Sequence, residues 1–126
     1  MSRPFVLLAA LSGFTGVALG AFAAHGLRGR LSPEYLAVFQ TGVLYQLIHA
    51  VALLGVGVLA LHWRSRLLGA AGSLFALGIL LFSGSLYLLT LSGLRVGMVT
   101  PLGGVCFLAG WLCLALAAWR ARPQAG

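Results

Sequence analysis

The chain has 126 residues, 61% of them apolar, and a formal net charge of +7 because eight arginines face a single acidic residue, Glu34. This composition excludes a soluble domain, because so small a domain cannot hide that much apolar surface from water. It also argues against nucleic-acid binding, since the arginines occur in ones and twos and form no basic face.

The charged residues divide the chain into four uncharged windows, at 4–27, 35–63, 67–94 and 96–119. Each window is longer than the roughly 20 residues that a helix needs to cross the hydrocarbon core of a bilayer. The sequence therefore predicts an all-α integral membrane protein, an antiparallel bundle of four transmembrane helices in one domain spanning 1–126. The expected helices are approximately 4–24, 35–62, 67–92 and 98–119.

The distribution of the arginines predicts the orientation of the bundle. Five of them fall on the side that holds both termini, namely Arg3, Arg64, Arg66, Arg120 and Arg122. The other three, Arg28, Arg30 and Arg95, fall on the opposite side. Cytoplasmic loops carry an excess of basic residues, and Trp63 and Trp119 fit an aromatic belt at the same membrane face. Both termini are therefore expected in the cytoplasm.

The first window resembles a secretory signal peptide, because Arg3 precedes an apolar stretch and 21–23 forms an A-x-A pattern. The window continues beyond a typical signal core, so we expect a retained helix. Gly16 and Gly20 form a GxxxG pair, which allows close approach of another helix. That helix could belong to the same chain or to a second copy in a homo-oligomer, and the sequence leaves both open.

The second helix is expected to begin at Ser32-Pro33-Glu34, because serine caps free amides and proline suits the first helical position. Its uncharged window contains Tyr45, Gln46 and His49, and helical spacing places Tyr45 and His49 on one face. An ionisable group at membrane depth is a candidate functional residue.

Further polar side chains are expected at a similar depth in the outer half of the bundle. The candidates are His25, Tyr45, Gln46, His49, Ser83, Ser85, Tyr87 and Thr100. We expect His49 to point into the bundle toward Ser83, Ser85 or Tyr87, since a histidine that faced lipid would leave its ring nitrogens unpaired. Glycines at 42, 84, 103 and 104 leave space for a small polar cavity open to the periplasmic side. Leucines at 53, 54, 59, 74, 77 and 114 are expected to close the inner half.

Several separated motifs resemble one family in the same order. They are 20–27 (GAFAAHGL), 40–42 (QTG), Tyr45-Gln46 with His49, 82–87 (FSGSLY), 100–104 (TPLGG) and Gly110-Trp111. This family is "domain of unknown function 423", small bacterial membrane proteins with a eukaryotic relative, transmembrane protein 256. Ala23 departs from it, since glycine is common at that position. The resemblance implies a four-helix, multi-pass protein of the bacterial inner membrane and implies no activity.

The residues themselves leave four functional readings open. The polar residues form an interhelical hydrogen-bond network, or they bind a small ligand, a lipid headgroup or a proton, with His49 as the titratable group and Tyr45 as its hydrogen-bond partner. A third reading is a haem, metal or quinone site built from His25 and His49, which Cys106 joins only if its helix turns it inward. No close pair of ligands supports this reading, so no cofactor or metal is predicted.

The fourth reading is an accessory subunit of a larger membrane complex, whose protein partner the sequence does not identify. An independent enzyme is not expected, since the only carboxylate is Glu34 at the membrane surface and no nucleophile, base and acid can be recognised by spacing. Cys106 and Cys113 lie seven residues apart, about 10.5 Å along a helix, which is too far for a disulfide.

Overall fold

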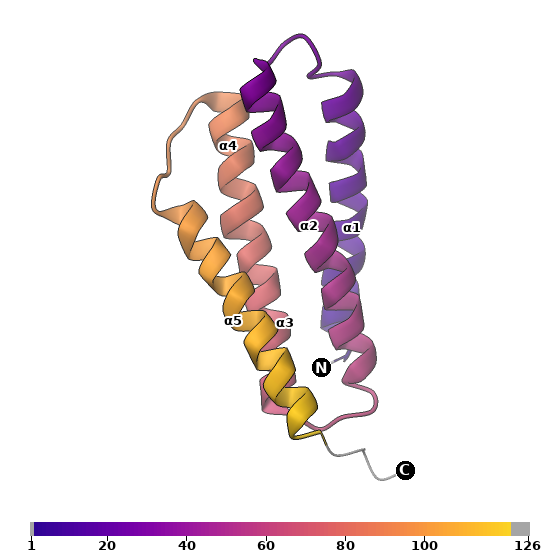
Figure 1. The fold of residues 1–126 in the computed structure, drawn as a ribbon. Helices are drawn as coiled ribbons and strands as arrows, with labels where there is room; N and C mark the ends of the chain where they lie inside the picture. The colour runs from indigo at the N-terminus through magenta and orange to yellow at the C-terminus, as the bar shows by residue number, and fades with distance from the viewer. Residues whose placement is uncertain (1, 122–126) are drawn as a thin grey trace.

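The computed structural model describes residues 2–121 and consists of helices joined by short connections (Figure 1). In chain order they are α1 (Ser2–His25), α2 (Pro33–Leu59), α3 (Arg66–Gly78), the π-helical segment η1 (Ile79–Ser83), α4 (Gly84–Ser92) and α5 (Val99–Trp119). The segments α3, η1 and α4 are continuous and form one span. Within 2–121 there are thus four helical spans that are long and apolar enough to cross a membrane, which confirms the predicted four-helix membrane protein.

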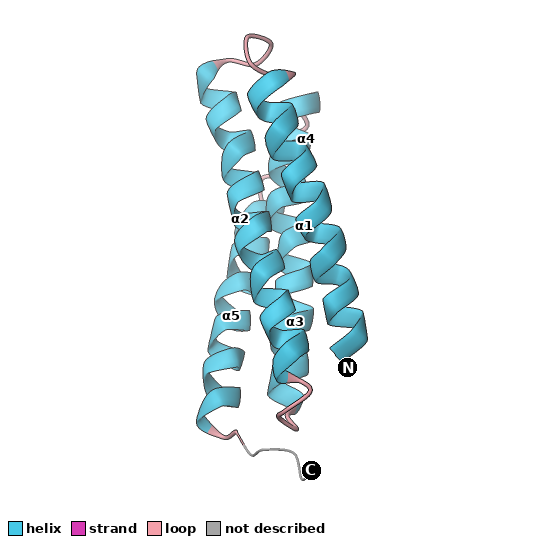
Figure 2. Ribbon diagram, turned by 90° about the vertical axis from the view of Figure 1, so that its right-hand side faces the viewer, coloured by secondary structure: helices cyan, strands magenta, loops and turns pink. Residues whose placement is uncertain are grey.

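The spans run alternately up and down (Figures 1 and 2). The start of α1, the α2–α3 connection and the end of α5 lie at one end, which we call the terminal end. The α1–α2 and α4–α5 connections lie at the other, which we call the loop end. The helix α1 packs along α2, α5 packs along α3 and η1, and α2 contacts α3, η1 and α4. The middle of the bundle is therefore α2 and the third span.

Serine side chains cap the N-termini of two helices. Ser32 Oγ accepts a hydrogen bond of 3.2 Å from the N–H of Tyr35 at the start of α2, where Pro33 is the first helical residue, as the sequence predicts. Ser65 Oγ accepts a bond of 3.2 Å from the N–H of Leu68 in the same way at α3. The helix α2 ends at Leu59 rather than at the expected residue 62, because the amides of 61 and 62 bond to carbonyl oxygens three residues earlier, at 3.1 and 2.9 Å, instead of four.

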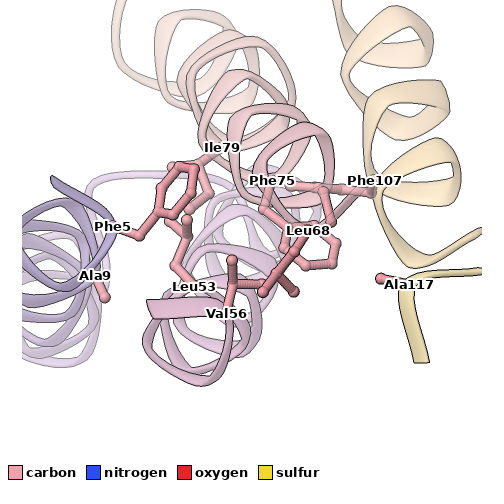
Figure 3. Packing of buried hydrophobic residues seen from close by; sticks show 10 residues of the cluster. Phe5, Ala9, Leu53, Val56, Leu68, Phe75, Ile79, Phe107 and Ala117 are labelled. Carbon is pink, nitrogen blue, oxygen red and sulfur yellow. The ribbon is translucent and has the colours of Figure 1, made fainter. Parts of the chain in front are cut away.

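The main apolar core lies toward the terminal end and draws on every span (Figure 3). Its buried members are Phe5, Ala9, Leu53, Val56, Leu68, Ala71, Phe75, Ile79, Phe107 and Ala117. Leu53 is fully buried, as expected, but Leu54 and Leu77 are 46% and 45% exposed, so the prediction that they fill the core was wrong. The buried positions of α2 follow 46, 49, 50, 53, 56 and 57, which turns residue 54 to the outside of the bundle.

Two glycines of helix α5 pack closely against the third span. A side-chain carbon on Gly103 would collide with the backbone of Phe82, and one on Gly110 would lie 2.7 Å from a ring carbon of Phe75. Near the loop end, α5 leans away from α4, and the two helices make few contacts (Figure 1). The space between the two helices at the loop end, which we call the wedge, is lined by Ser85 and Leu89 of α4 and by Thr100 of α5.

The GxxxG pair of α1 faces α2 within the chain. A side-chain carbon on Gly16 would lie 2.7 Å from Leu47 Cδ2, and one on Gly20 would lie 3.2 Å from Val43 Cγ1. Close packing of α1 on α2 therefore uses this face. A homo-oligomer built through the same two glycines would need α1 to separate from α2.

Candidate functional site

His49 is buried in the bundle, with 3% of its surface exposed. Its Nδ1 lies 2.7 Å from the backbone oxygen of Tyr45, one helical turn earlier, and its Nε2 lies 3.1 Å from Nε1 of Trp111 on α5. The ring of Phe107 stacks on the imidazole at a centroid distance of 3.6 Å and an angle of 9°, and Phe75 packs at 5.5 Å. His49 thus lies in an aromatic box between α2, α3 and α5.

These two hydrogen bonds determine which nitrogen of His49 carries the proton. The Tyr45 carbonyl oxygen can only accept, so Nδ1 donates to it. The Trp111 indole N–H can only donate, so Nε2 accepts from it. The ring is therefore neutral with its proton on Nδ1, and both nitrogens are occupied by protein groups.

The partners of His49 differ from those expected. We predicted contacts with Ser83, Ser85 or Tyr87 and a hydrogen bond from the Tyr45 side chain, but the structure supplies Trp111 and the Tyr45 backbone. The reason is the rotation of the third span, which directs Phe75 toward His49 and its polar residues elsewhere. The Tyr45 ring instead packs against Phe82 and Phe107.

A second group of polar residues joins α1, α2 and α4 around Gln46, which is 4% exposed. The Gln46 amide donates to the Ser12 carbonyl oxygen at 2.9 Å and to Thr15 Oγ1 at 2.8 Å. Its oxygen accepts a bond of 2.6 Å from the hydroxyl of Tyr87. Both amide protons of Gln46 are thereby used, and one residue ties three helices together.

Ser83 and Ser85 serve two different interfaces. Ser83, the last residue of η1, donates a bond of 2.7 Å to the carbonyl oxygen of Gly42 on α2. Ser85 donates to the Phe82 carbonyl oxygen at 2.8 Å, so the 2.5 Å bond between its Oγ and Thr100 Oγ1 takes its proton from Thr100. The third span is thus joined to α2 through Ser83 and to α5 through Ser85.

The residues predicted as one cluster therefore form separate groups, and His25 and His49 lie far from each other. His25 is exposed at the last position of α1, while His49 lies 16 residues into α2, roughly 24 Å along its axis from Pro33. They cannot ligate one haem or metal ion from these positions, so the geometry does not support that alternative. Among residues 2–121, no cluster of three or more His, Cys, Asp or Glu side chains could hold a metal ion.

The polar groups are satisfied by the protein itself. Within the described residues, no buried side-chain nitrogen or oxygen atom lacks a hydrogen-bond partner. The space expected beside Gly42 is also filled, because a side-chain carbon there would lie 2.9 Å from the ring of Tyr87. The arrangement is that of an interhelical network.

Two recesses border this network. A groove of about 300 Å³ runs between α1 and the third span, past Ser12, Thr15, Gln46 and Tyr87. A pocket of about 320 Å³ occupies the wedge between α4 and α5 at the loop end, and we call it the loop-end pocket. Its walls include Tyr35, Ser85, Leu89, Arg95, Val96 and Thr100. The predicted single cavity is thus replaced by separate recesses, and only Ser85 and Thr100 of the predicted residues line the loop-end pocket.

Sequence reasoning missed Trp111, Thr15 and Arg95. Trp111 was noted only as part of a family motif, although an indole N–H inside an uncharged window needs an acceptor and could have been paired with His49. Thr15 was overlooked because a lone threonine in an apolar helix usually bonds its own backbone, and it does so here as well, to Leu11 at 2.9 Å. Arg95 was read only as a topology signal.

Most of the residues in these polar groups fall within a region that matches a known protein family. The family model described as "Protein of unknown function (DUF423)" matches residues 19–104, a stretch that holds most of the polar groups above. The chain belongs to the DUF423 family.

Bacterial relatives of the DUF423 chain share nearly its full length. It is 47% identical over 125 residues to the "UPF0382 inner membrane protein YgdD" of Escherichia coli, covering 98% of this chain and 95% of that one. It is 44% identical over 117 residues to the "UPF0382 membrane protein SAB0533" of Staphylococcus aureus, covering 92% and 95%. It is 43% identical over 122 residues to the "UPF0382 membrane protein YwdK" of Bacillus subtilis, covering 92% and 96%. No solved structure matches the chain significantly.

DUF423 membership agrees with the four spans. The relatives are membrane proteins by name, and the Escherichia coli one is an inner membrane protein. The chain is accordingly a multi-pass protein of the bacterial inner membrane. The names of these relatives assign no activity, so function has to be argued from the geometry.

Proposed function

We propose that this protein is a membrane scaffold, an accessory subunit that neither transports nor catalyses. Its internal polar groups hold the helices in register, and its surface carries its contacts with other membrane components. One observation carries the proposal: within residues 2–121, every buried side-chain nitrogen or oxygen already has a hydrogen-bond partner. A transport or catalytic centre needs polar groups free to engage a solute, and this interior offers none.

The surroundings of His49 argue against a proton pathway. A second proton on the ring would point from Nε2 toward the Trp111 N–H, which cannot accept it. Toward the terminal end, the next buried side chains of α2 are those of Ala50, Leu53 and Val56, which offer a proton no hydrogen-bond partner. A proton on His49 would therefore need the aromatic box to rearrange and would still face an apolar barrier.

The hydrogen bonds suit a role in positioning helices. Hydrogen bonds between transmembrane helices contribute roughly 0.6 to 2 kcal/mol each, and packing between helices gains nothing from the hydrophobic effect inside lipid. Gln46 and Ser83 each bind a backbone carbonyl of a neighbouring helix, which specifies how the helices are aligned along their axes. A fixed alignment is what a surface used for recognition requires.

Reconstitution into proteoliposomes tests the proposal. With a potassium diffusion potential and an entrapped pH dye, vesicles that contain the protein should acidify no faster than protein-free vesicles. Proton flux that the wild type supports and that His49→Leu abolishes would contradict the scaffold proposal and indicate a proton pathway through His49.

Purification from native membranes in mild detergent tests the accessory role. We expect a partner polypeptide in fixed stoichiometry, detected by native mass spectrometry, which also counts the copies of this chain. Haem or quinone retained at one equivalent would contradict the proposal in favour of a cofactor protein. Copies of this chain alone, with neither partner nor cofactor, would contradict the accessory role.

A further inference from the structure

The loop-end pocket owes its existence to the divergence of α4 and α5. The two spans touch at Gly103 and Phe82, and near the loop end α5 leans away from α4 (Figure 1). Helix α4 ends at Ser92, and the next residue, Gly93, has a φ of 73° in the left-handed region, which turns the chain out of the helix. The connection then crosses the wedge and places Arg95 and Val96 in the wall of the pocket.

Arg95 is exposed, and within residues 2–121 it makes no hydrogen bond or ion pair with another residue, Glu34 included. At the loop end, three arginines (28, 30 and 95) face this one carboxylate, a difference of +2. A guanidinium group offers a planar fork of N–H donors that matches two oxygens of a phosphate.

The remaining walls fit an amphiphile better than a free ion. The hydroxyl of Tyr35 makes no hydrogen bond with the described residues, so it can donate to the same anion as Arg95. Leu89 and Val96 supply apolar walls. Ser85 and Thr100 have both of their hydroxyl protons committed within the protein, so the deeper wall leaves no donor unpaired against an apolar group.

We propose that the loop-end pocket binds an anionic phospholipid. Its phosphate lies against Arg95 and Tyr35, and its glycerol ester and the first part of an acyl chain lie along Leu89 and Val96. The position suits this ligand, because the pocket is at the end of the bundle, where a span meets the headgroup layer. This inference goes beyond the scaffold proposal and does not depend on it.

The test compares lipid binding to the full-length protein and to two matched arginine variants. The protein is purified in a neutral detergent, and phosphatidylglycerol or phosphatidylcholine with identical acyl chains is added. Retained lipid is counted by native mass spectrometry, and unfolding is followed by thermal shift. We expect the wild type to prefer phosphatidylglycerol and Arg95→Gln to bind it about tenfold more weakly, the loss of one charge-assisted bidentate contact.

Arg28→Gln is the control, because Arg28 is an exposed arginine at the same end but does not line the pocket. It should retain the preference, and Arg95→Lys should recover only part of it because an ammonium group lacks the fork. Equal binding by Arg95→Gln and wild type would overturn the site, and so would an equal loss in Arg28→Gln. Inorganic phosphate that displaced the lipid at millimolar concentration would overturn the lipid assignment in favour of a soluble anion.

Discussion

The indole N–H of Trp111 donates a hydrogen bond of 3.1 Å to Nε2 of His49 and so joins α5 to α2. The backbones of these two helices hardly approach each other, so the contact between them is made by side chains. The ring of Phe107 lies on the imidazole at 3.6 Å and reinforces the same connection. The pair therefore determines how α5, otherwise packed on the third span, is held against α2.

Replacing Trp111 by Phe should destabilise the protein, because Nε2 of the buried His49 would lose its donor. We expect a loss of about 1 to 2 kcal/mol in the free energy of unfolding in detergent, and a coupling of at least about 0.6 kcal/mol in a double-mutant cycle with His49→Leu. Trp119→Phe is the control, since Trp119 is 88% exposed at the end of α5. Equal stability of the two tryptophan variants would show that the hydrogen bond contributes nothing.

Two tyrosines provide a matched test of the Gln46 network. The hydroxyl of Tyr87 donates to Gln46 Oε1 at 2.6 Å, whereas that of Tyr45 makes no hydrogen bond with the described residues. Tyr87→Phe should therefore cost about 1 kcal/mol, while Tyr45→Phe should change the stability by less than about 0.5 kcal/mol. Denaturant unfolding of both purified variants measures the difference. A larger effect at Tyr45 would mean that its hydroxyl has a partner outside the chain.

Adjacent glycines test the contact between α5 and the third span. A methyl group on Gly103 would collide with the backbone of Phe82, which cannot move aside as a side chain can, while one on Gly104 would meet nothing within 4 Å. Gly103→Ala should destabilise the protein by about 1 to 3 kcal/mol through overpacking. Gly104→Ala should be neutral or slightly stabilising, because alanine is the better helix former. Similar melting temperatures for the two variants would contradict this packing.

The orientation of the bundle in the membrane stays a prediction from the arginine distribution. In a variant whose Cys106 and Cys113 are replaced by Ala, a cysteine at Gly29 should react with a membrane-impermeant maleimide added to intact spheroplasts. A cysteine at Ser65 should react only after the membrane is permeabilised. The positive-inside rule is the reason, since the terminal end carries the larger number of arginines. The reverse labelling pattern would show that the bundle has the opposite orientation in the membrane.

The four spans could be predicted because they depend on composition alone. An uncharged window such as 35–63 must form a helix in lipid, where every backbone amide and carbonyl needs an internal partner. The start of α2 was predicted as well, since Ser32, Pro33 and Glu34 act on the first turn that follows them. Burial of His49 followed from the same requirement for hydrogen-bond partners.

The partners of these residues were decided by the tertiary structure. In an aqueous protein, the apolar face of a helix marks its interior, but a transmembrane helix is apolar on every face, so the sequence of α2 did not distinguish Leu53 from Leu54. The rotation of each helix about its axis depends instead on which side chains fit the glycines of its neighbour. Phe82 at Gly103 and Phe75 at Gly110 place α5 so that Trp111, and no serine of the third span, reaches His49. Such a fit arises only when two helices meet, and for that reason sequence spacing within one helix could not reveal it.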